Sequence, residues 1–402
     1  MNMRKTIPSL IVLTFVACAD EPPLTPVNLA KLPADAKPCP AVPVKSISAA
    51  MSATFAVLED GSVCGWGDGL PIDREAHSPE LLPALARVVQ VAGGYQFACA
   101  RNDDGAVSCW GNGEYGATGV KSEKYVAKPS PIAGLSATAI AAGEHHACAL
   151  LADGSARCWG RANFGQLGDG SKVDKAIPSP VAGITDAESL ACGFDTCCVT
   201  RKGGSVACWG IFAWEEGERQ HPTPVEIPGV TGAKRVVVGP NQGCAFSESG
   251  DATCWGSSVF AELGGREAVL WPPRAAPDFA NAKQIAFTYE TAIWINESGT
   301  TFGRGMNASG ELGIGEQARY RNGAPTITVP RPLALHDAVE LAASRQHLCA
   351  RLASGSVVCA GANSNGQLGN GPTGVSSARM LVALDRRQPA TSGSEPNRKV
   401  SR

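Results

Sequence analysis

The sequence lacks a strong excess of charge of either sign. Its 402 residues include 35 lysines and arginines against 37 aspartates and glutamates, which leaves a net charge of −2. A surface for nucleic acid or for anionic lipid needs a basic excess, so the balance argues against both kinds of partner. Charged residues make up only 18% of the chain and apolar residues 44%, which is enough apolar material to bury a sizeable core.

Motifs of the common hydrolases and nucleotide-binding enzymes are also missing. There is no HExxH motif, no phosphate-binding loop and no Ser-His-Asp order, so we predict no catalytic residue, no metal site and no cofactor. The densest carboxylates, Glu215, Glu216 and Glu218, share the segment IFAWEEGERQHP. Three acids in one loop usually form a solvated surface. The alternative is an envelope hydrolase acting on polysaccharide, with Glu215 and Glu216 as its acid–base pair.

Apolar runs long enough to cross a membrane are absent as well. After a positively charged start, residues 7–16 are largely apolar, but they are too few to span a bilayer as a mature helix. The run ends in FVAC, which resembles a bacterial lipobox with Phe15 in place of the usual leucine. We therefore predict lipidation of Cys18 and attachment to the membrane through this anchor only. Cleavage after Ala19 is the alternative and gives a secreted protein; either route exports the chain to the bacterial cell envelope or beyond.

Polar or proline-rich segments lie on both sides of the central region. Residues 1–17 are the predicted signal peptide, and residues 18–42, rich in proline, alanine and aspartate, are predicted to be a disordered tether. Residues 386–402 are predicted to be a disordered polar tail. The folded domain is expected between them, over residues 43–385.

Glycine and proline, by contrast, are plentiful, with 46 and 28 residues, as is typical of a fold with many tight turns. A unit such as QFACARNDDGAVSCWGNGEYGATG, which begins at Gln96, recurs seven times. The turn glycines of successive units are 44 to 56 residues apart, which is the period of propeller blades, and no unit shows helical periodicity. We predict an all-β, seven-bladed β-propeller with four-stranded antiparallel blades. The turn glycines are Gly61, Gly105, Gly154, Gly204, Gly250, Gly299 and Gly355.

The spacing of the cysteines follows from a hairpin in each unit. A three-residue loop, 103–105, with Gly105 in the left-handed conformation, places Arg101 opposite Val107 and Cys99 opposite Cys109. A facing pair without ladder hydrogen bonds has its Cα atoms about 4.5 Å apart, a separation that a disulfide tolerates. Five units contain such a pair: Cys99 and Cys109, Cys148 and Cys158, Cys198 and Cys208, Cys244 and Cys254, and Cys349 and Cys359.

Four other cysteines can form two more bridges. Cys192 and Cys197 sit in one loop, and Cys39 paired with Cys64 would attach the tether to the first blade. With Cys18 lipidated, all 15 cysteines are then accounted for, which favours an oxidising compartment. A zinc site is disfavoured because zinc cysteines usually occur as C-x₂₋₄-C with a second pair nearby.

The sequence of the repeated unit resembles that of a known family. GEHHACALLADGSARCWGRANFGQLGDG, from Gly143, and GANSNGQLGNG, at 361–371, resemble the regulator of chromosome condensation repeat. The resemblance covers about residues 43–385 and implies a seven-bladed propeller closed by strands from both ends of the chain. Residues 40–48 and 378–384 would then share one blade.

The resemblance also implies structural roles for the recurring side chains. His146 and His347 occupy the histidine position of the repeat and are expected to be hydrogen-bonded framework residues, while His145 should face the other side of its strand. The recurring tryptophans are expected to pack between neighbouring sheets. They are Trp66, Trp110, Trp159, Trp209 and Trp255.

Function must come from surfaces, because a propeller by itself assigns none. The eukaryotic namesake of the family is a nuclear exchange factor that binds nucleosomes, which an exported chain without a basic patch does not fit. We predict a non-catalytic, monomeric binding or scaffold protein of the bacterial envelope, whose partner is a protein or an envelope glycan. Loops that break the repeat contain residues enriched at interfaces, although these aromatics could instead cover a blade edge. The candidates are Phe212, Trp214, Glu215, Trp271, Arg319 and Tyr320.

Overall fold

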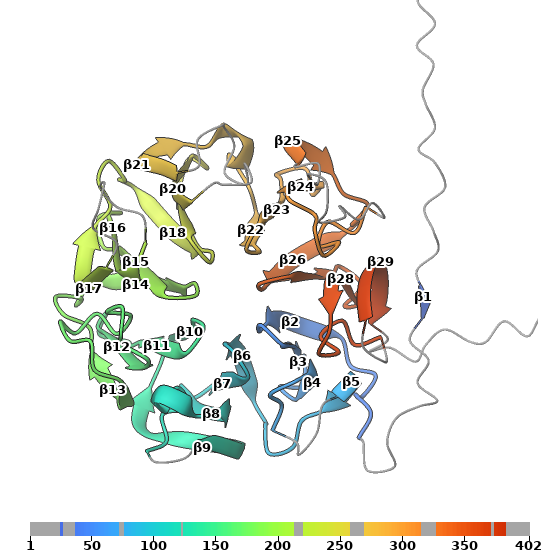
Figure 1. Cartoon of the computed structure of the whole chain (residues 1–402), viewed down its shortest axis with the longest axis horizontal. Coiled ribbons are helices and arrows are strands. Elements are labelled where there is room, and N and C mark those ends of the chain that lie inside the picture. Colours follow the sequence, from blue (N-terminus) through green and yellow to red (C-terminus); the bar gives the residue numbers. More distant parts are fainter. Residues whose placement is uncertain are drawn as a thin grey trace, which may run out of the picture.

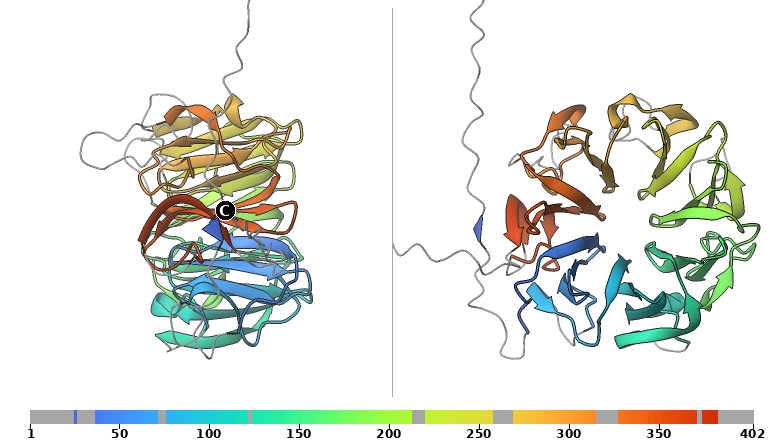
Figure 2. Two further views of the ribbon diagram at one scale, coloured as in Figure 1. Left: turned by 90° about the vertical axis from the view of Figure 1, so that its right-hand side faces the viewer. Right: turned by 180° about the vertical axis from the view of Figure 1, so that it is seen from behind.

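The computed structural model describes residues 25–26, 37–71, 76–121, 124–212, 220–257, 269–314, 327–370 and 374–382. These residues form seven antiparallel sheets of four consecutive strands each, arranged radially around a central axis (Figure 1). Seen from the side, the sheets form a disc (Figure 2). The predicted all-β, seven-bladed propeller is therefore confirmed.

Each blade takes its four strands from one contiguous stretch of chain. Blade one contains β2 (Val44–Ala49), β3 (Ala53–Leu58), β4 (Val63–Gly67) and β5 (Ala76–Leu81). Blade two contains β6 (Val88–Gly93), β7 (Phe97–Asn102), β8 (Ala106–Asn112) and β9 (Tyr125–Ser136), with the 3-10 turn η2 (Glu114–Gly116) between the last two. Blade three contains β10 (Ala139–Ala142), β11 (His146–Leu150), β12 (Ala156–Gly160) and β13 (Lys175–Pro180). Blade four contains β14 (Ala187–Cys192), β15 (Thr196–Arg201), β16 (Val206–Ile211) and β17 (Gln220–Glu226).

The remaining blades follow the same order. Blade five contains β18 (Ala233–Val238), β19 (Gln242–Ser247), β20 (Ala252–Ser257) and β21 (Val269–Ala275), and the 3-10 turn η3 (Pro277–Phe279) follows it. Blade six contains β22 (Gln284–Phe287), β23 (Thr291–Ile295), β24 (Thr301–Gly305) and β25 (Ile327–Pro332). Blade seven contains β26 (Ala338–Ala343), β27 (His347–Leu352), β28 (Val357–Asn363) and β29 (Gly374–Val382). The first strand of each blade lies nearest the axis (Figure 1).

We expected residues 40–48 and 378–384 to share a blade and so close the ring. This expectation is wrong. β2 belongs to blade one and β29 to blade seven, because four consecutive strands already complete each sheet. The two blades instead meet through a packed interface that includes Trp66, Cys349 and Leu368. On the outer edge of blade seven, the two-residue strand β1 (Thr25–Pro26) pairs in parallel with β29.

The hairpin register is the one that the cysteine spacing predicts. Cys99 faces Cys109 and Arg101 faces Val107, and the bonded cysteines have Cα atoms 4.0 Å apart. Gly105 has φ +88° and its N–H donates to the carbonyl of Asn102, which closes the turn. Seven disulfides are present in the described residues: Cys39–Cys64, Cys99–Cys109, Cys148–Cys158, Cys192–Cys197, Cys198–Cys208, Cys244–Cys254 and Cys349–Cys359.

The last residues of the predicted tether are attached to blade one. The carbonyl of Lys37 accepts a hydrogen bond of 2.8 Å from the N–H of Leu81, Pro38 forms a bridge with Glu80, and Cys39 is bonded to Cys64. The part of the chain that is attached to the propeller therefore includes residues 37–39.

Seven apolar clusters hold the disc together, one at each interface between neighbouring blades. The five recurring tryptophans are at most 1% exposed, as expected for residues between sheets. Trp66, Trp159 and Trp209 each donate their indole N–H to a carbonyl of the preceding blade, at 2.8 to 3.0 Å. In blade six the equivalent position holds Arg304, which is 1% exposed and lies over the rings of Phe279 and Trp294.

Candidate binding surface at the mouth of the central cavity

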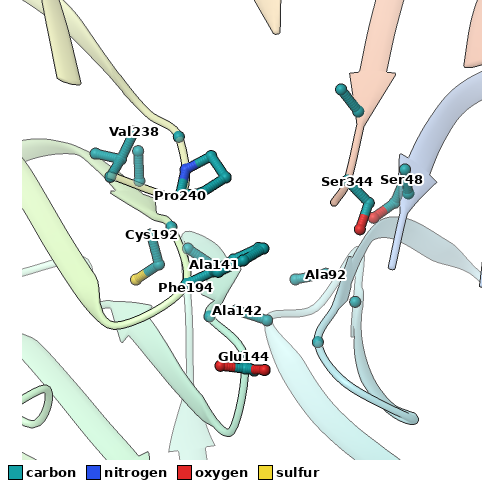
Figure 3. A pocket seen from close by; sticks show the side chains of 18 of the residues that line it. Ser48, Ala92, Ala141, Ala142, Glu144, Cys192, Phe194, Val238, Pro240 and Ser344 are labelled. Carbon is teal, nitrogen blue, oxygen red and sulfur yellow. The ribbon is translucent and has the colours of Figure 1, made fainter. Parts of the chain in front are cut away.

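The inner strands enclose a cavity of about 320 Å³ on the axis of the disc. Its walls are built mainly from small side chains, such as Ala92, Ala141 and Ala142, because seven strands converge there and leave little room (Figure 3). The charged residue Glu144 also lines the cavity. Figure 3 shows Cys192, Phe194 and Pro240 on one side of the cavity and Ser48 with Ser344 on the other.

The turns that follow the inner strands lie at one end of this cavity, and several of them are hydrogen-bonded to the turn of the next blade. The N–H of Met51 donates to the carbonyl of Gly94, that of Tyr95 to Glu144, and that of Glu144 to Phe194, at 2.7 to 3.2 Å. Across blades six and seven, the N–H of Tyr289 donates to Arg345 at 3.1 Å. Because these bonds join the turns of blades one to four to each other, and those of blades six and seven, the backbone that holds these side chains is restrained.

Aromatic and arginine side chains lie on these turns and on the neighbouring connections after β8 and β12, and we call them the rim surface. In the first group, His145 makes edge contacts with Tyr95 and Tyr115, with both ring centroids 5.3 Å from its own. The guanidinium of Arg161 lies over Tyr115 at 5.2 Å. The rim surface consists of Tyr95, Tyr115, His145, Arg161, Phe194, Tyr289 and Arg345.

The second group of the rim surface spans blades four, six and seven. Phe194 stacks with Tyr289 at 6.1 Å between centroids, and the guanidinium of Arg345 lies 5.9 Å from the Tyr289 ring. Tyr115 and Tyr289 are 37% and 41% exposed, which is high for large aromatic side chains. The π faces and guanidinium groups at this end of the cavity are therefore accessible to a ligand or partner.

Carboxylates lie beside the rim surface. Burial lowers the pKa of His145, while the nearby charge of Glu144 opposes this shift. Burial raises the pKa of Glu290, which adjoins Tyr289. His145 is therefore a neutral ring near pH 7, suited to aromatic contacts and hydrogen bonding.

His146 and His347 lie in the blade interfaces. Burial lowers the pKa of each to about 4, so both rings are neutral. Nε2 of His347 lies 3.0 Å from the hydroxyl of Thr54 in blade one, and Nε2 of His146 lies 3.1 Å from Sγ of Cys197 in blade four. Both contacts join neighbouring blades.

One group of side chains in the described ranges is close enough to share a metal ion. His146, Cys148, Cys192 and Cys197 have ligand atoms within 4.8 Å of one another. Zinc is bound by cysteine thiolates, and these three cysteines are oxidised in disulfides. The group as it stands therefore does not present a thiolate ligand set.

The predicted partner-binding residues are only partly covered by the structure. Phe212 is 5% exposed and packs on His221 at 4.6 Å between ring centroids, in the apolar cluster between blades four and five. Its side chain covers the core, which is the alternative that the sequence left open for these aromatics. Trp271 lies in β21, and nothing is described of its side chain. The remaining predicted residues, Cys18, Trp214, Glu215, Glu216, Arg319 and Tyr320, lie outside the described residues.

Sequence reasoning missed the rim surface, although a signal for it was present. The second residue after each inner strand is Met51, Tyr95, Glu144, Phe194, Pro240, Tyr289 or Arg345. These seven residues include three aromatics and one arginine, whereas the position just before them holds small residues such as Ala50, Gly94 and Ser344. Aligning the seven units by their turns would have shown four members of the rim surface: Tyr95, Phe194, Tyr289 and Arg345.

Within the described residues, no helix has the length and apolar character needed to span a bilayer. Comparison with known families finds models of the regulator of chromosome condensation (RCC1) repeat. One matches residues 88–117, 137–166 and 338–367, and another matches 104–150 and 153–200.

Solved structures with the same architecture are distant in sequence. Prp20p from Saccharomyces cerevisiae is 21% identical over 85% of this chain and 87% of its own, with a TM-score of 0.70. The yeast RCC1 (Prp20) in the crystal structure with Kap60 is 19% identical over 86% of this chain and 85% of its own, also with a TM-score of 0.70. Human WBSCR16 is 19% identical over 76% of this chain and 86% of its own, with a TM-score of 0.65. At these identities the likeness shows the fold.

Proposed function

Because this chain is a seven-bladed propeller with segments that match models of the regulator of chromosome condensation repeat, we propose that it is a non-catalytic binding protein of the bacterial cell envelope. It presents the rim surface to a protein partner and acts there as a rigid scaffold. The yeast relative, which was crystallised with Kap60 and studied for binding to Gsp1p and histones, shows a propeller of this kind in use as a platform for proteins.

The arrangement of the rim surface is the observation that carries this proposal. Tyrosine and arginine are enriched in the few residues that dominate protein interfaces, and aromatic anchors lose little side-chain entropy when they bind. Here such residues gather at one end of the disc in two contact groups, and several of the turns beneath them are hydrogen-bonded to each other. A preorganised frame reduces the cost of ordering a binding site. Two groups of exposed side chains at one end of the disc also suit the broad face of a protein better than a deep pocket would.

Export is supported by the cysteine chemistry. Seven disulfides lie in the described residues, and such bridges form and persist in oxidising compartments. Lipidation of Cys18 is part of the proposal and would hold the disc at a membrane surface. Replacement of Cys18 by serine should then release the protein from the membrane fraction and abolish incorporation of labelled palmitate.

A matched pair of double variants tests the binding surface. Tyr115 and Tyr289 project from the rim surface, whereas Ile177 and Val329 are 64% and 72% exposed on the outer strands β13 and β25. The partner is first identified by cross-linking in intact cells and then purified. Its affinity is measured for the wild-type protein, for Y115S/Y289S and for I177S/V329S.

We expect Y115S/Y289S to weaken binding at least tenfold, because two hot-spot aromatics are lost. The control I177S/V329S should change the affinity less than twofold. The opposite pattern would assign the partner to the circumference of the disc. Equal effects of both variants would reject the rim surface as the binding site. The far-ultraviolet circular dichroism of both variants should match that of the wild type, since all four side chains are exposed.

A further inference from the structure

The disulfide Cys192–Cys197 occupies a position that no other bridge in the described ranges shares. It joins facing residues at the end of β14 and near the start of β15, on either side of the turn that connects these strands, and their Cα atoms are 4.1 Å apart. The repeated bridges, such as Cys198–Cys208, instead join the second and third strands of a blade. Cys192 is partly exposed and lines the central cavity, with its sulfur visible in Figure 3. A small thiol in the cavity can therefore reach this bridge.

A second disulfide touches the first one from the neighbouring blade. Sγ of Cys197 lies 3.4 Å from Sγ of Cys148, which is bonded to Cys158 in blade three. Both bridges are oxidised, so this is a contact between two disulfide sulfurs. Thiol–disulfide exchange proceeds by attack of a thiolate on a disulfide sulfur. A thiolate formed on Cys197 would already be in contact with its next target.

His146 completes the arrangement. Its Nε2 lies 3.1 Å from Sγ of Cys197, and its ring is fully buried and neutral. The Nε2–H tautomer donates a hydrogen bond to the sulfur. Such a donor stabilises a thiolate more than it stabilises a disulfide, because the thiolate carries the full charge. Cys197 is thereby favoured over Cys192 as the leaving group.

We propose that Cys192–Cys197 is a thiol–disulfide exchange site that a small-molecule thiol opens from the central cavity and that passes the exchange on to Cys148–Cys158. The external thiolate attacks Sγ of Cys192 and forms a mixed disulfide there, while Cys197 leaves as a thiolate. Cys197 then attacks Sγ of Cys148 and forms a Cys148–Cys197 bond between blades three and four. Cys158 leaves as a thiolate and takes up the proton that the external thiol lost. Two disulfides and one thiol are present before and after, so the external thiol is the only co-reactant.

The interface between blades seven and one offers a natural comparison. There Thr54 takes the place of Cys197, with its hydroxyl 3.0 Å from Nε2 of His347 and 3.7 Å from Sγ of Cys349. The same packing is therefore achieved with a hydroxyl group. A sulfur at residue 197 adds reactivity that the framework does not need.

Glutathione is the probe for this site. The native, fully oxidised protein is incubated with reduced glutathione without denaturant, quenched in acid, alkylated and mapped as non-reduced peptides. We expect glutathione on Cys192, alkylation of Cys158 and a Cys148–Cys197 cross-linked peptide. These products should form at least tenfold faster than Cys349–Cys359 opens. If Cys192–Cys197 opens no faster than Cys349–Cys359, the exchange site is rejected, and glutathione on Cys192 without the Cys148–Cys197 peptide rejects the relay.

A control variant copies the threonine arrangement. C192S/C197T places a hydroxyl beside His146, as Thr54 does beside His347, so the variant is expected to fold with its other six bridges intact. In this variant Cys148–Cys158 should be as resistant to glutathione as Cys349–Cys359. Continued fast opening of Cys148–Cys158 would show that Cys197 plays no part.

Discussion

At the scale of single residues, blade six departs from the repeat at a buried position. Glu311 stands where blades three and seven have Gln166 and Gln367, and it is 2% exposed. Its carboxylate accepts a 3.1 Å hydrogen bond from the N–H of Ser309. Burial is the main cause that raises the pKa of Glu311 to about 7, and the charge of Glu290 acts in the same direction.

This pKa shift predicts that E311Q increases the stability of the fold by an amount that depends on pH. Between pH 4.5 and about 7 the folded protein holds a proton on Glu311 that the unfolded chain has lost, so stability falls as the pH rises through this window. Glutamine does not titrate, so E311Q should raise the free energy of unfolding at pH 8 by up to about 3 kcal/mol and change it little at pH 4. Urea unfolding at both pH values measures the difference. An equal gain at pH 4 and pH 8 would show that the charge of Glu311 is not the cause.

At the scale of strands and hairpins, the repeated disulfide stabilises a register that the strands already share. Blade six has Ile293 facing Gly303 where five of the other blades have the cysteine pair, and Ile293 is fully buried. The hairpin therefore forms without a covalent link. The bridge adds stability mainly by restricting the unfolded chain.

Removal of one such bridge should weaken the fold without changing its architecture. In C244A/C254A the loop between the two residues is no longer closed in the unfolded state, and we expect a loss of about 2–3 kcal/mol. The midpoint of urea unfolding measures the loss, and a near-ultraviolet circular dichroism spectrum like that of the wild type shows that the tertiary packing is kept. An unchanged midpoint would mean that the bridge does not restrict the unfolded chain.

Much of this architecture follows from the sequence because its signals are local. The facing of Cys99 and Cys109, the turn at Gly105 and the buried tryptophans depend on neighbours within one hairpin. The rim surface depends on turns of different blades, about fifty residues apart, and the closure of the ring depends on the two ends. Phe212 is an example of a residue whose burial the sequence did not predict. Its loop departs from the repeat, but its ring packs on His221 in a cluster that contains residues of blades four and five.

At the scale of the whole molecule, closure of the ring means that none of the seven interfaces between blades lies at an end of the assembly. Trp66 lies between the first and last blades, while Trp159 lies between blades two and three, and both are fully buried. In an open stack of repeats, each unit contacts only its neighbours and an end can fray independently. In a ring, the interface at Trp66 is as internal as that at Trp159, because opening either one turns the disc into the same kind of open stack.

This equivalence predicts similar effects of W66A and W159A. Each removes a fully buried indole, and we expect each to lower the free energy of unfolding by about 3–5 kcal/mol. Hydrogen exchange followed by mass spectrometry should show that both variants lose protection across all seven blades, since opening one interface weakens the whole ring. If W66A increased exchange only in β2 to β5 and β26 to β29, the first and last blades would behave as free ends, and closure through the Trp66 interface would not be what makes the disc cooperative.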